Sequence, residues 1–144
     1  MRVRTGLKTL RPEPRGASAV ELALIAPVFI ALVMGQIETS RLGMVSQLIT
    51  TAAREGCRVA VLPGVTQDDV TNRINTVLAN SGISVGTVTP TCPSPYTWTS
   101  APMGTPITVS MSVPYSQVSW LGTPYYLKTA VVSASATLSC EKPF

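Results

Sequence analysis

An apolar segment of about twenty residues begins directly after a short basic block. The segment, residues 17–36, contains one ionisable side chain, Glu21. A helix of about 20 apolar residues spans the hydrocarbon core of a bilayer. We therefore predict a transmembrane segment at 17–36. Because charge at such a depth is costly, the presence of Glu21 indicates a function.

The net positive charge of the chain is confined to the residues before this segment. Residues 1–16 contain five Lys/Arg and one Glu, whereas residues 17–144 contain six basic and six acidic side chains. Basic residues beside the first apolar helix hold that end of a chain in the cytoplasm. We predict a basic cytoplasmic leader at 1–16 and an extracytoplasmic domain at 37–144. A neutral domain argues against nucleic acid as a partner, because phosphate binding needs a basic face.

The helical pattern continues beyond the apolar segment. Apolar residues recur at spacings of three and four after Gly35, which predicts an amphipathic continuation of the helix over 37–60. Pro27 removes a backbone donor inside this helix and crowds the preceding turn, so we predict a helix bend there. The expected core-facing residues of the continuation are Leu42, Val45, Ile49, Ala52, Gly56 and Val59.

A short second helix is predicted at 67–80. Thr66 is suited to cap its N-terminus, and Asp68 and Asp69 suit the positive end of its dipole. Gly82 is the expected left-handed residue after its C-terminus.

Three later segments alternate apolar and Ser/Thr residues with a period of two. They predict strands near 83–89, 106–114 and 130–140, and the proline-rich stretch 90–106 predicts a surface loop. The apolar face of these strands needs a cover, which the second half of the long helix can supply. We expect an α+β fold in which this helix packs on a small antiparallel sheet of about three strands, with one short extra helix.

The cysteine pattern favours disulfide chemistry over metal binding. Cys57, Cys92 and Cys140 have no C-x-x-C spacing, and the chain has no His, so we predict no metal site. Disulfides persist outside the cytoplasm. The candidate bridge joins Cys92 and Cys140. Cys57 is a competing partner, and three reduced, packed thiols are the other arrangement.

Other chemistry is not indicated. Ser and Thr are abundant, but a nucleophile needs a base within reach, and no phosphate-binding glycine loop is present. We expect no enzyme activity, no cofactor and no small-molecule substrate. Four aromatic residues between the last two strands are expected to cover the end of the sheet, with a subunit contact or adhesive surface as the alternative. They are Tyr115, Trp120, Tyr125 and Tyr126.

The junction of leader and apolar segment resembles a type IV prepilin cleavage site. A basic leader is followed by Gly16, and Glu21 is the fifth residue after that glycine. The run from Arg15-Gly16-Ala17 through Glu21 and Pro27 to Ala52-Ala53-Arg54-Glu55-Gly56 resembles the TadE/TadG family of minor pseudopilins of Tad-type pilus systems. Leu22 departs from the pattern, because many Tad-system pilins have an aromatic residue there.

The resemblance implies a pilin-like fold and cleavage between Gly16 and Ala17 by a prepilin peptidase. It also implies that Glu21 meets the N-terminal amine of a neighbouring subunit during assembly. The implied partners are the peptidase, other pilin-like subunits and the pilus assembly platform. The implied location is the bacterial inner membrane, crossed once with the N-terminus in the cytoplasm, or an extracellular pilus.

Two other interpretations remain. An uncleaved, single-pass membrane anchor carrying an extracytoplasmic binding domain has the same hydropathy pattern. An ordinary secretory signal has an apolar stretch of about 7–15 residues and a small-residue cleavage site, and the apolar segment here is longer.

Overall fold

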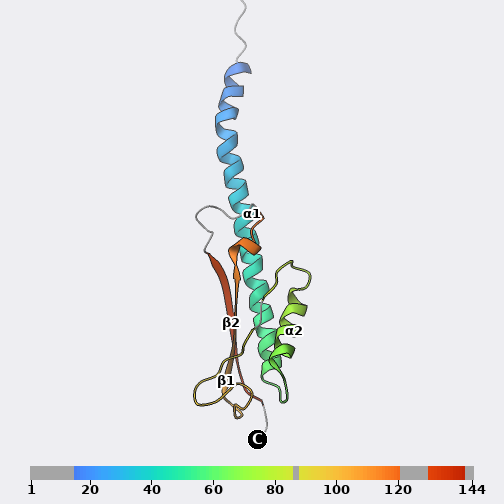
Figure 1. Cartoon of the computed structure of the whole chain (residues 1–144). Coiled ribbons are helices and arrows are strands. Elements are labelled where there is room, and N and C mark those ends of the chain that lie inside the picture. Colours follow the sequence, from blue (N-terminus) through green and yellow to red (C-terminus); the bar gives the residue numbers. More distant parts are fainter. Residues whose placement is uncertain (1–14, 86–87, 121–129, 142–144) are drawn as a thin grey trace, which may run out of the picture. The chain divides into compact units, whose positions relative to one another are not determined.

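The computed structural model describes residues 15–85, 88–120 and 130–141. The chain divides into two compact units, Met1–Gln36 and Ile37–Phe144. Leader residues 1–14 lie outside the described residues. The elements in chain order are α1 (Arg15–Ala60), α2 (Gln67–Leu78), β1 (Pro106–Pro114), the 3₁₀ turn η1 (Tyr115–Gln117) and β2 (Val131–Ser139) (Figure 1).

The first unit contains the beginning of α1. The helix starts at Arg15, two residues before the predicted transmembrane segment, and it continues on both sides of Pro27. The bend at Pro27 stays a prediction. Most side chains from Gly16 to Gln36 are exposed, so this part of the helix presents its apolar residues to its surroundings.

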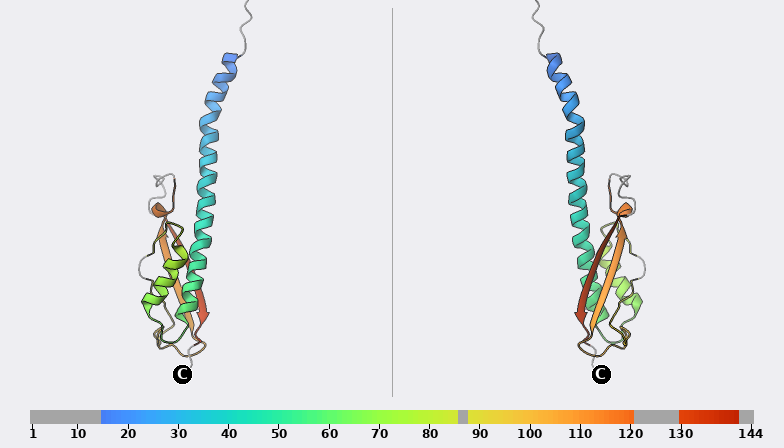
Figure 2. Two further views of the ribbon diagram at one scale, coloured as in Figure 1. Left: turned by 90° about the vertical axis from the view of Figure 1, so that its right-hand side faces the viewer. Right: turned by 90° about the vertical axis from the view of Figure 1, so that its left-hand side faces the viewer.

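The second unit has its core between the rest of α1, α2 and β1 (Figure 2). Val45, Ile49, Ala52 and Gly56 are buried as predicted, whereas Val59 is half-buried and Leu42 is 38% exposed. The buried face of α1 is wider than the predicted one, because three further small residues are fully covered. These are Ala53, Cys57 and Ala60.

α1 and α2 pack closely at Gly56. A Cβ atom placed on Gly56 would lie 2.7 Å from both Cγ1 and Cδ1 of Ile74, which is itself fully buried. Glycine at this position lets the two helices approach each other.

α2 begins as the sequence predicted. The Thr66 backbone N–H and hydroxyl donate to Asp69 Oδ2 at 2.9 and 2.7 Å, and the Asp69 N–H donates to Thr66 Oγ1 at 3.3 Å. This reciprocal capping box satisfies donors that the first helical turn leaves free. The helix ends at Leu78, two residues before the predicted end, and Gly82 has the expected positive φ of 70°.

Within the described residues the sheet has two antiparallel strands, and the predicted α+β class is confirmed. β1 and β2 pair continuously from Pro106 opposite Ser139 to Pro114 opposite Val131. The core-facing residues of β1 are buried, whereas their neighbours on β2 are half-buried or exposed. The four buried residues are Ile107, Val109, Met111 and Val113.

The expected third strand near 83–89 is wrong for the described residues of that segment, 83–85 and 88–89, which form no strand. Instead, Thr91 forms an isolated bridge with Thr108, with both backbone N–H···O distances 2.8 Å. Proline lacks the N–H that a ladder requires. Pro90 and Pro93 lie close to Thr91 on either side. The segment around Thr91 therefore cannot extend its single bridge with β1 into a continuous ladder.

β1 runs in the direction opposite to α1. The Cys57 thiol donates to the Ile107 carbonyl at 3.2 Å at one end of β1, and the Tyr115 hydroxyl donates to Glu38 Oε1 at 2.5 Å at the other. The loop before β1 therefore lies at the Cys57 end of α1, and η1 lies at the Glu38 end (Figure 2).

The contact at Gly56 predicts a specific loss of stability. Gly56→Ala should lower the free energy of unfolding by about 1–2 kcal/mol, because overpacking against Ile74 outweighs the gain in helix propensity. Urea denaturation of the full chain in detergent micelles measures this. Gly43→Ala is the matched control, since a Cβ there meets nothing within 4 Å, and it should be neutral or stabilising. An equal effect of the two substitutions would contradict the packing argument.

The capping box predicts a pH dependence. Hydrogen bonds from the Thr66 hydroxyl and backbone lower the pKa of Asp69. A lowered folded-state pKa contributes stability above the unfolded value of about 4, and this stability is lost as the pH falls through the folded pKa. Asp69→Ala should therefore lower the urea midpoint at pH 7 and have progressively less effect towards pH 3. Asp68→Ala, in the same turn, is the control and should show a smaller pH-dependent change.

Candidate functional site

The predicted cleavage site lies in the first turn of α1. Gly16 is the second residue of the helix and Ala17 the third, and both are exposed. A Cβ placed on Gly16 would meet no atom within 4 Å. Packing within the described residues therefore does not require glycine at this position.

Glu21 lies one helical turn after Ala17. Residues four apart are on the same face of a helix, so an amine released on Ala17 would share a face with this carboxylate. Glu21 is exposed, and so are its apolar neighbours Val20 and Leu22, at 63% and 67%. In an apolar surrounding a carboxylate is costly unless it is neutralised or paired.

Around Glu21, from Ala17 to Met34, the exposed side chains of α1 are mostly apolar. Among the described residues, α1 is the helix long and apolar enough to cross a membrane, and the apolar part is not buried in the protein. Its large exposed side chains include Leu24, Ile25, Val28, Phe29, Ile30 and Leu32. The helix is compatible with a single-pass membrane anchor.

A polar cluster fastens η1 to α1 where the second unit begins. Besides the bond from Tyr115 to Glu38, Arg41 Nε donates to the Val118 carbonyl at 3.3 Å. The Arg41 guanidinium carbon lies 5.1 Å from the centroid of the Trp120 ring. Sequence analysis missed Glu38 and Arg41. The available signal was their position as the first two charged residues after the apolar segment.

The two described aromatic residues of the predicted group differ in exposure. Tyr115 is buried at the end of β1, as expected for a residue that covers the sheet. Trp120 is 69% exposed although its turn is fixed to α1. Tyr125 and Tyr126 lie outside the described residues.

The three cysteines are free thiols, so the candidate Cys92–Cys140 bridge is absent from the structure. The Cys92 thiol donates to the Tyr96 carbonyl at 3.0 Å, and the Cys140 thiol donates to the Ala101 carbonyl at 3.3 Å. Burial raises the pKa of the Cys57 thiol. Each thiol therefore has a carbonyl acceptor of its own.

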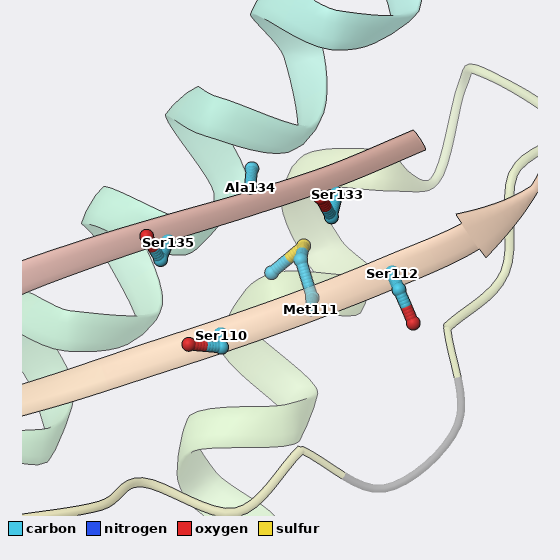
Figure 3. Close-up of a pocket in the computed structure, with 6 residues that line it drawn as sticks. All are labelled: Ser110, Met111, Ser112, Ser133, Ala134 and Ser135. Carbon is cyan, nitrogen blue, oxygen red and sulfur yellow. The ribbon is translucent and has the colours of Figure 1, made fainter. Parts of the chain in front are cut away.

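The sheet carries a shallow depression of about 440 Å³. Figure 3 shows its lining, with serines on both strands around Met111 and Ala134. The serines are exposed and face each other in cross-strand pairs, Ser110 with Ser135 and Ser112 with Ser133. None of the lining residues can act as a base for these hydroxyls, so the depression lacks the parts of a nucleophilic site.

Charged side chains gather where α1 faces α2. Glu55 forms an ion pair with Arg58 at 3.0 Å and a second one with Arg73 of α2 at 2.7 Å. The hydrogen bond from Arg73 is the main cause of a lowered pKa of Glu55. Exposed pairs of this kind add little stability, so we assign this cluster a structural role.

Comparisons with curated proteins and with solved structures gave no match. Residues 16–58 match the family of TadE-like proteins, which confirms the TadE/TadG resemblance over that segment of the chain.

Proposed function

We propose that this chain is a minor pseudopilin of a Tad-type pilus or secretion apparatus. In this proposal, a prepilin peptidase cuts between Gly16 and Ala17 after the chain has inserted with its leader in the cytoplasm. The processed chain then assembles with other pilin-like subunits through the first part of α1. The TadE-like match supports an association of the chain with the Tad pilus and with a membrane.

One observation carries the proposal. The TadE-like match begins at Gly16, at the residue where a basic leader changes to a helix with exposed apolar side chains. Packing among the described residues does not explain why position 16 is a glycine. A peptidase that requires a small residue before the scissile bond supplies such a reason.

Assembly through α1 follows from the charge of Glu21. A carboxylate on an apolar helix surface is stabilised by a partner of opposite charge, and the amine created at Ala17 of a neighbouring subunit provides one. A head-to-tail contact of this type builds a filament when successive copies do not close into a ring.

Processing is tested at the scissile bond. In cells with an active prepilin peptidase, wild-type protein should have a new N-terminus at Ala17, and Gly16→Ala should accumulate as the full-length precursor in the membrane. Intact-mass spectrometry distinguishes the two forms. Gly35→Ala is the matched control, because a Cβ there also meets nothing within 4 Å, and it should be processed normally.

A wild-type chain that keeps residues 1–16 under these conditions would instead favour the uncleaved membrane-anchored binding domain. Normal cleavage of Gly16→Ala would remove the assignment of Gly16 to the cleavage site.

Assembly is tested at Glu21. Glu21→Ala and Glu21→Gln should insert and be processed but should reduce the amount of this subunit in sheared filaments about tenfold or more, as expected for loss of a buried charge pair. Quantitative immunoblotting of membrane and filament fractions measures this. Leu22→Ala, at an adjacent and equally exposed position, should have a smaller effect. Wild-type incorporation of both Glu21 variants would rule out the paired-charge role.

A further inference from the structure

We infer that Trp120, held by Arg41, is an interfacial anchor that places the membrane-proximal end of the second unit in the lipid headgroup layer. The inference rests on the membrane anchoring contained in the proposed function. It adds a second contact with the lipid, made by a residue that is 79 positions away from its partner Arg41 in the sequence.

The exposure of Trp120 is not the result of a loose turn. Tyr115 and Val118, which precede it, are buried at 4% and 1% exposure. Both form hydrogen bonds with α1: the Tyr115 hydroxyl donates to Glu38, and the Val118 carbonyl accepts from Arg41. The fold thus keeps a large aromatic side chain at the surface, at a fixed point beside the helix.

Arg41, the residue of α1 that contacts the Trp120 ring, is close in sequence to the apolar segment. Arg41 follows Gln36, the last residue of the first unit, by five residues of α1. Five helical residues rise about 7.5 Å, and the headgroup layer on each side of a bilayer is roughly 5–8 Å thick. If residues 17–36 fill the hydrocarbon core, the turn of α1 that carries Arg41 lies at the outer part of the headgroup layer.

The chemistry of the pair suits this layer. Tryptophan is enriched at membrane–water interfaces, because its ring is apolar and its indole N–H is polar. Arg41 donates hydrogen bonds to the Val118 and Ser81 carbonyls, at 3.3 and 3.5 Å. Its guanidinium holds the ring through a cation–π contact, which is stronger when water is partly excluded.

The chain contains a matched control, because it has two tryptophans. Trp98 lies in the loop before β1, at the Cys57 end of α1, and is half-buried. Sixteen residues of α1 separate Arg41 from Cys57, a rise of about 24 Å. Trp98 should therefore remain outside the headgroup layer.

The experiment uses the full chain in phosphatidylethanolamine–phosphatidylglycerol vesicles that contain a lipid with a nitroxide on its headgroup. Trp98→Phe leaves Trp120 as the sole tryptophan, and Trp120→Phe leaves Trp98. Co-flotation with the vesicles is checked first. We expect about twofold quenching of Trp120 emission by the nitroxide lipid and little quenching of Trp98.

The other outcomes separate the two proposals. A chain that floats with the vesicles but whose Trp120 is quenched by aqueous iodide and not by the nitroxide lipid overturns this inference and leaves the membrane anchor intact. Trp120 shielded from both quenchers means that protein covers it, which also overturns the inference. If the chain does not float with the vesicles, both the membrane anchor and the contact of Trp120 with the headgroup layer are ruled out.

Discussion

The packing of the second half of α1 against α2 and β1 is the constraint on which the rest of the structure depends. At Gly56 this packing leaves no room for a methyl group beside Ile74. The same helix carries large, exposed aliphatic residues before Gln36 and small, buried ones from Ala52 to Ala60. One regular helix can thus serve two surroundings, because side-chain size changes along it: large apolar groups where the protein does not cover it, and small ones where other elements approach its backbone.

Glu21 and Glu38 have different environments, although both lie on α1. Glu38 accepts a hydrogen bond from Tyr115 within its own unit, so its charge helps to fix η1 beside the helix. Glu21 lies on an exposed apolar surface four residues after Ala17. The first carboxylate contributes to the tertiary structure of the chain. The second, if the proposed function holds, contributes to contacts between chains.

Local signals explain which features were predictable from the sequence. The periodicity of α1, the Thr66–Asp69 cap and the alternation of β1 and β2 each depend on neighbouring residues, and each was predicted. The third strand was predicted wrongly, because alternation at Ile83 and Val85 does not reveal whether a partner strand is available. Glu38 and Arg41 were missed because their partners Tyr115 and Val118 are each 77 residues away. Gly16, Ala17 and Glu21 were found from their order in the chain, but their proposed roles involve other molecules, which the contacts within one chain do not test.

The strands of the sheet contain no ionisable residue, and most of their outward-facing side chains are hydroxyls, including the Thr108–Thr137 pair with an oxygen–oxygen distance of 2.8 Å. On the α1–α2 side, Glu55, Arg58 and Arg73 form a linked set of charges. Dissolved salt screens exposed charges and has little effect on neutral hydroxyls. Changes in ionic strength should therefore affect the electrostatics of the helical side of the second unit more than the hydration of the sheet.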